Sequence, residues 1–111
     1  MRLVFYILIL LLLPKSLLAE DNIADKEYVV KIEKHVFLPA EIQVEANKKF
    51  KLVIQNNDST IEEFESDDLK KEKLVGAKKS VSIAVGPLKA GEYKFYGDFH
   101  QKTAQGKIIV K

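Results

Sequence analysis

The sequence predicts an all-β sandwich of seven or eight strands with one short helix. Apolar residues alternate with polar or neutral ones in short runs, as in the segments Tyr28–Ile32 and Phe50–Ile54. Alternation with a period of two is typical of strands that are buried on one face. Turn-forming residues separate the runs, at Asn47, Gly76, Gly86-Pro87 and Gly91.

Further runs of the same kind lie at residues 42–46, 81–85, 93–95 and 108–110. The predicted short helix follows Ser66-Asp67-Asp68, where polar residues able to cap a helix precede Leu69–Lys73. Tyr93 enters a strand just after the bend at Gly91, which is the setting of a tyrosine corner. We therefore expect a structural role for Tyr93 and no chemistry.

The first 19 residues have the pattern of an export signal. Arg2 provides the basic start, Leu3–Leu13 is an unbroken apolar run, and Ala19 ends a plausible cleavage site. The run is shorter than the roughly 20 apolar residues that a transmembrane helix needs. We expect residues 1–19 to be a signal peptide and residues 20–111 to form one domain, with no stable membrane span after cleavage. An uncleaved anchor is the alternative.

Composition narrows the function classes. Without Arg2 and Lys15, the 18 basic residues fall to 16, equal to the 16 acidic ones. A balanced surface charge gives no support for nucleic-acid binding. The chain has no cysteine, which excludes thiolate metal chemistry and disulfides.

The C-terminal segment Tyr93–Val110 consists of a strand, a loop that carries His100 and a closing strand. It resembles the C-terminal signature of the cupredoxins, the small blue-copper fold, in which Tyr-x-Phe-Tyr precedes a Cys, a His and a Met ligand. The residues that match are Tyr93, Phe95, Tyr96 and His100. Gly97 stands at the Cys position and Gln105 at the Met position. The resemblance implies a cupredoxin-like Greek-key sandwich with a metal site that lacks its sulfur ligands.

The same resemblance implies candidates for the other ligands. Cupredoxins place their first ligand His shortly after an Asn pair that ends a central strand, and here that position falls on Glu62, with Glu63 one residue away as a competitor. His35 precedes Phe37 and lies, by analogy with the fold, near the ligand-bearing end. Asp98 is a candidate to orient the imidazole of His100, and Gln105 to offer a weak axial oxygen.

One branch of the family is more similar. The segments Glu62–Ser66 (Glu-Glu-Phe-Glu-Ser) and Gly97–His100 (Gly-Asp-Phe-His) resemble the cupredoxin-like domains of bacterial ferrous-iron uptake systems of the Efe and Ftr type. This resemblance implies a periplasmic protein that handles iron or copper and serves a ferrous-iron permease or another periplasmic uptake component.

The chemistry of the candidate ligands agrees with a site that is not blue. Imidazole and carboxylate suit Cu(II), Zn(II) or Fe(II), whereas blue copper requires a thiolate. We expect one copper or iron ion held by His100, His35 and either Glu62 or Glu63. Two alternatives remain at this point, a copper-dependent ferroxidase and a metal-free sandwich that acts as an adaptor between proteins.

Overall fold

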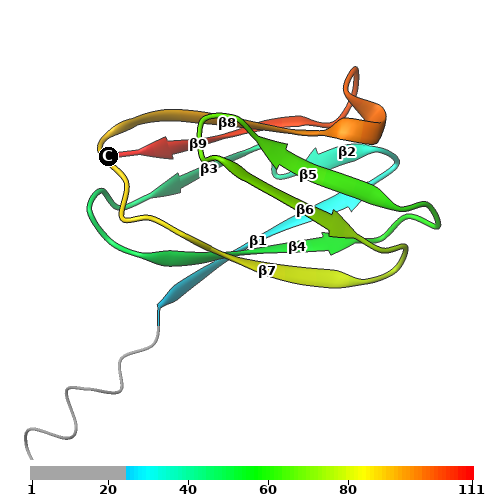
Figure 1. Ribbon diagram of the computed structural model, residues 1–111, viewed down its shortest axis with the longest axis horizontal. Helices are drawn as coiled ribbons and strands as arrows, with labels where there is room; N and C mark the ends of the chain where they lie inside the picture. The colour runs from blue at the N-terminus through cyan, green and yellow to red at the C-terminus, as the bar shows by residue number, and fades with distance from the viewer. Residues whose placement is uncertain (1–24) are drawn as a thin grey trace, which may run out of the picture.

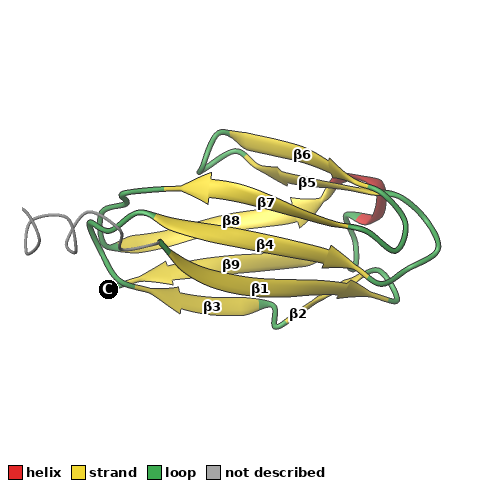
Figure 2. Cartoon of the chain, turned by 90° about the horizontal axis from the view of Figure 1, so that it is seen from below, coloured by secondary structure: helices red, strands yellow, loops and turns green. Residues whose placement is uncertain are grey.

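The computed structural model describes residues 25–111, which form two β-sheets packed face to face (Figures 1 and 2). The all-β sandwich is confirmed, but it has nine strands where seven or eight were expected. No helix among the described residues is long and apolar enough to cross a membrane. The predicted signal peptide, residues 1–19, lies outside the described residues.

The strands are β1 Lys26–Glu33, β2 Val36–Leu38, β3 Glu41–Val44, β4 Phe50–Asn56, β5 Glu62–Ser66, β6 Lys71–Val75, β7 Ser80–Val85, β8 Gly91–Gly97 and β9 Gln105–Val110.

Both sheets are mixed. The first has the order β2-β1-β4-β7 and the second the order β3-β9-β8-β5-β6. Strands β1 and β4 are parallel neighbours, as are β3 and β9, and the other pairs are antiparallel. Strands far apart in the sequence therefore meet in the second sheet, because β9 lies between β3 and β8.

The core lies between the sheets and follows the predicted alternation. In β4 the buried positions include Phe50, Leu52 and Ile54, and the intervening side chains are more exposed. Phe37 of the first sheet packs edge-on against Phe95 of the second, with ring centroids 4.9 Å apart. Aromatic rings buried across the interface add a specific contact to the hydrophobic effect, and this fixes how the two sheets are placed.

The connection between Ile54 and Ser80 contains the extra strands. Residues predicted to be a short helix after Ser66 instead form the turn and second strand of the hairpin β5–β6, so that prediction is wrong. Ser66 does accept the N–H of Leu69, as a helix cap would, but the chain then turns at Lys70, whose φ is +56°. The same local bond stabilises a turn or a helix start, so capping residues alone did not distinguish them.

The predicted tyrosine corner is present. Tyr93 donates a hydrogen bond of 2.8 Å from its hydroxyl to the carbonyl of Lys89. This bond closes the bend that leads into β8.

Three connections gather at one end of the sandwich, opposite the C-terminus (Figure 1). They are the turn between β1 and β2, the loop between β4 and β5, and a short 3-10 helix, η1 Asp98–His100, between β8 and β9. We call this end the η1 end. Each of these connections supplies a polar side chain to one cluster: His35 from the turn, Asp58 from the loop and His100 from η1.

Candidate metal centre

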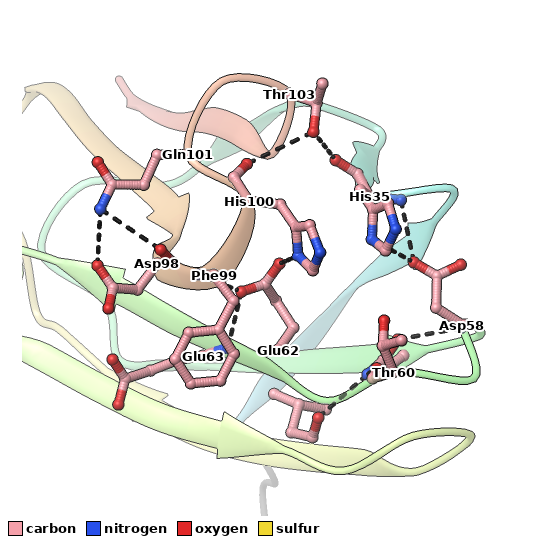
Figure 3. Close-up of polar contacts among 12 residues, drawn as sticks. His35, Asp58, Thr60, Glu62, Glu63, Asp98, Phe99, His100, Gln101 and Thr103 are labelled. Carbon is pink, nitrogen blue, oxygen red and sulfur yellow. Dashed lines mark hydrogen bonds and ion pairs between the residues drawn. The ribbon is translucent and has the colours of Figure 1, made fainter.

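The two histidines, 65 positions apart in the sequence, lie in contact at the η1 end (Figure 3). His100 ends η1, and His35 lies in the turn between β1 and β2. Their imidazole rings are stacked, with centroids 3.6 Å apart and planes inclined by 13°. The analogy that placed His35 near the ligand-bearing end agrees with this arrangement.

Glu62 supplies a buried carboxylate to His100. It is the first residue of β5 and faces inward with Phe64 and Ser66, so it is only 1% exposed. Its Oε2 lies 2.7 Å from Nδ1 of His100. Its Oε1 accepts the backbone N–H of Phe99 and that of Glu63, each at 2.9 Å. A buried carboxylate is stable only when it is bonded in this way, and these bonds hold it in one position.

Asp58 supplies a second carboxylate, which sequence reasoning missed. Its two oxygens accept the backbone N–H groups of Lys34 at 2.7 Å and His35 at 3.0 Å, and one oxygen lies 3.4 Å from Nδ1 of His35. Burial opposes the charge on Asp58, but these N–H groups and the positive charges nearby outweigh it and keep the pKa of the carboxyl below its ordinary value. The local sequence around Asp58 does not indicate this role, because its hydrogen-bond partners, Lys34 and His35, lie more than 20 residues away in the sequence.

The turn that presents His35 is conformationally costly. Lys34 and His35 have φ values of +52° and +61°, the pattern of a two-residue hairpin turn that normally favours Asn-Gly. Each such residue costs on the order of 1–3 kcal/mol unless its surroundings impose the conformation. The Asp58 carboxylate, which accepts both N–H groups of the turn, provides that constraint. The position of His35 therefore depends on Asp58.

Two further residues hold the three connections together. Thr103, after η1, donates a 2.6 Å hydrogen bond from its hydroxyl to the carbonyl of His35. Asn56, 1% exposed, donates its amide to the carbonyls of Thr60 and Val75 and accepts the N–H of Asp58. The imidazoles and carboxylates are thus set by a network that spans both sheets.

Three residues named from the sequence face away from the imidazoles. Glu63 alternates with Glu62 and is turned to the outside of β5. Asp98 accepts a bond from the side chain of Gln101, and the carboxylate against the ring of His100 belongs to Glu62. Gln105 is exposed and donates to the carbonyl of Gln101, whereas its neighbour Ala104 is fully buried.

The outer face of β5 and β6 carries a separate acidic group. Carboxylate oxygens of Glu63, Glu65 and Glu72 lie within 4.8 Å of one another. Partial desolvation raises the pKa of the Glu63 carboxyl, and the negative charges of Glu72 and Asp98 raise it further. Three carboxylates therefore lie close together on this face.

Tyr96 gives a testable consequence of that charge. Its hydroxyl donates to Glu65 at 2.9 Å, and this bond, with partial burial and the charge of Asp67, raises the pKa of Tyr96 to about 12. Since the native pKa lies above the unfolded value of 10.0, the associated stability is present below that pH and is lost as pH rises through about 12. We expect Glu65→Gln to move the titration of Tyr96 back toward its ordinary value, measured by tyrosinate absorbance. Tyr96→Phe, which removes this titration, is the control, and an unchanged pKa in Glu65→Gln would contradict the account.

The donor atoms determine which metals the site fits. A blue copper site does not fit, because residues 25–111 contain no cysteine or methionine that could place a thiolate or thioether near His100. Imidazole and carboxylate donors do fit a borderline divalent ion such as Cu(II), Zn(II) or Fe(II). His100 and Glu62 have donor atoms in direct contact, and the ring of His35 stacks on the ring of His100. Among the described residues, however, these three side chains do not offer donor atoms that all lie within 4.8 Å of one another.

The two stacked sheets, with their polar cluster at the end that carries η1, define a cupredoxin-class β-sandwich without sulfur donors. The chain belongs to the cupredoxin-like domain family, whose sequence profile matches residues 2–110. A relative in Rickettsia prowazekii (strain Madrid E), the uncharacterized protein RP394, is 50% identical over 90 residues, which are 81% of this chain and 70% of that protein.

Solved structures share the fold at low sequence identity. Auracyanin A, a "blue" copper protein of Chloroflexus aurantiacus, superposes with a TM-score of 0.68 at 15% identity, over 79% of this chain and 100% of that one. The metal-binding domain of the Cu(I)-exporting ATPase CopA of Streptococcus pneumoniae gives 0.65 at 17% identity, over 77% and 84%. Amicyanin from Paracoccus versutus gives 0.61 at 17% identity, over 82% and 87%. The expected cupredoxin-like fold is therefore confirmed.

Proposed function

We propose that this protein is an exported, periplasmic metal-binding protein. It holds one copper or iron ion at a site that is not blue and serves a ferrous-iron permease or another periplasmic uptake component. The observation that supports the proposal most is the contact of His35 and His100 beside the buried carboxylate of Glu62. The chain contains no other histidine, and both lie at the same end of the sandwich.

His100 and Glu62 would supply the fixed donors, because backbone N–H groups already hold the carboxylate. His35 would supply the adjustable donor. Its side chain is 40% exposed, and its contact with Asp58 is longer, at 3.4 Å, than the 2.7 Å contact of His100 with Glu62. Rings stacked within 13° of parallel do not direct their nitrogens at one point, so binding requires His35 to turn from its present orientation.

The nature of the ion follows from donor chemistry and supply. Two imidazoles and one carboxylate form the set that non-haem Fe(II) sites use, whereas intrinsic affinity favours Cu(II) over Fe(II). Iron would bind if a partner delivers it. The link to iron uptake depends on the resemblance of Glu62–Ser66 and Gly97–His100 to the domains of ferrous-iron uptake systems.

Metal titration of the purified protein tests this proposal. We expect wild type to bind one equivalent of Cu(II), and of Fe(II) under anaerobic conditions, by isothermal titration calorimetry. His100→Ala and His35→Ala should each weaken binding by about 10-fold or more, since each removes a ligand or the partner that positions one. Lys102→Ala, an exposed residue of the same loop, is the matched control.

Two results would contradict the proposal. Unchanged affinity in His100→Ala would show that any ion binds elsewhere. Absence of binding by wild type would leave the metal-free adaptor as the better interpretation. Oxidation of more than one Fe(II) per protein in air would instead define a ferroxidase.

A further inference from the structure

Gly97 occupies the position where the family signature has its Cys, and its backbone does not require glycine. Its φ and ψ are −93° and 114°, an extended conformation open to every residue type. A Cβ atom at this position would nevertheless lie 2.7 Å from both Cδ and Oε2 of Glu62 and 2.8 Å from Cβ of Ala104. These separations are far below ordinary van der Waals contact of about 3.5–4.0 Å. The glycine is therefore needed for space.

The Glu62 carboxylate fills that space and has little freedom to leave it. It is 1% exposed and bonded to two backbone N–H groups and to Nδ1 of His100. Ala104 bounds the other side and is fully buried. Any side chain at position 97 must displace either the carboxylate or the Ala104 segment. A thiol at position 97 and the Glu62 carboxylate thus compete for one volume.

We infer that Gly97 is a positioning residue: its missing side chain seats the Glu62 carboxylate against His100, and the pair thereby selects a divalent ion that accepts oxygen and nitrogen donors over Cu(I). The selection of an ion rests on the proposed function, whereas the packing of Gly97 against Glu62 does not depend on it. Soft thiolate and thioether donors favour Cu(I), whereas carboxylate donors favour harder ions. The exchange of a thiol for this carboxylate changes the class of ion that the same fold can hold.

A thermal-unfolding cycle on the metal-free protein tests the packing. We expect Gly97→Ala to lower the melting temperature by about 5–10 °C, because crowding a packed site is costly. In the Glu62→Ala background, where the carboxylate is absent, Gly97→Ala should lower it by less than half as much. Gly76→Ala is the control, since its Cβ would approach only the flexible side chain of Lys79, at 3.3 Å. Equal losses in the two backgrounds would overturn the inference.

The cycle also covers a variant that does not fold. If Gly97→Ala alone is insoluble, recovery of folded protein in the double variant supports the inference. Failure of the double variant, when Glu62→Ala alone folds, overturns it, because the obstruction would then lie at Ala104.

Binding of Co(II), followed by its visible absorption, tests the selectivity. We expect Gly97→Ala to weaken Co(II) binding by about 10- to 100-fold, as loss of a positioning partner does. The same change should weaken Cu(I) binding far less, as measured by competition with a chromogenic chelator. The double variant, Gly97→Ala with Glu62→Ala, should bind Co(II) with the same affinity as Glu62→Ala alone. Wild-type affinity for Co(II) in Gly97→Ala overturns the selectivity. If wild type binds no metal the proposed function fails, and the unfolding cycle still decides whether Gly97 positions Glu62.

Discussion

Glu62→Ala should lower the free energy of unfolding by about 2–4 kcal/mol, because it removes a buried acceptor and leaves its donors without partners. The backbone N–H groups of Glu63 and Phe99 and the ring of His100 all lose their hydrogen-bond acceptor. The same change should weaken Cu(II) binding by about 10-fold or more. Urea unfolding measures the first effect and calorimetric titration the second.

Glu63→Ala is the matched control, since it deletes a neighbouring carboxylate of the same strand that points to the outside. We expect its stability to equal that of wild type or to exceed it slightly, because the negative charges of Glu72 and Asp98 surround Glu63. Its metal affinity should be unchanged. If Glu63→Ala were the more damaging of the two changes, Glu62 would not be the carboxylate of the site.

Asn56→Ala should lower the free energy of unfolding by about 3 kcal/mol, the second large effect. The Asn56 amide donates to the carbonyls of Thr60 and Val75 at 2.8 and 3.1 Å, and its oxygen accepts the N–H of Asp58 at 3.0 Å. The loop that carries Asp58 and leads to Glu62 would lose its main tether. We therefore expect metal affinity to fall together with stability, in the same urea and calorimetric measurements.

Asn57→Ala provides the comparison. Its amide makes a 3.3 Å contact with Glu33 at the surface, and removal of an exposed contact of this kind should change stability by about 0.5 kcal/mol or less. Equal losses for Asn56→Ala and Asn57→Ala would show that the buried amide does not hold the loop.

Local pattern predicted most of the fold, because strands that bury one face leave a period of two in the sequence. The local pattern gave a wrong prediction where the alternation was short and charged residues interrupted it. Strand β6, Lys71–Val75, buries only Val75, so its sequence carries no alternation and the capping residues before it favoured a helix. Strand β5 also pairs with β8 on its other side, and this contact between distant segments is absent from the local sequence pattern.

The site was predictable to the extent that it follows the family signature. The resemblance named His100 and Glu62, with Glu63 as a competitor one residue away, and in the structure Glu62 shares the inward face of Phe64. Asp58 was missed because it acts on a turn formed by Lys34 and His35, which only the fold brings near. The function of Gly97 was missed for a related reason, since a missing side chain has meaning only when its neighbours are known.

The stack of the two imidazoles links the sequence to the proposed function. Two carboxylates set the ring positions, with Glu62 under His100 and Asp58 beside His35. In the described residues, this cupredoxin-like fold places only nitrogen and oxygen donors at the η1 end. Under the proposed function these donors would hold a divalent ion, and the chain has no cysteine to supply the thiolate on which blue-copper electron transfer depends.

Nuclear magnetic resonance of the protein labelled with ¹⁵N only in histidine tests the central claim most directly, because the chain has two histidines. Diamagnetic Zn(II) is added in steps while the ring nitrogens of both residues are observed. We expect the signals of one nitrogen of His35 and one of His100 to shift together and both changes to saturate at one equivalent. A shift of only one ring, or saturation of the two at different equivalents, would contradict a shared metal site.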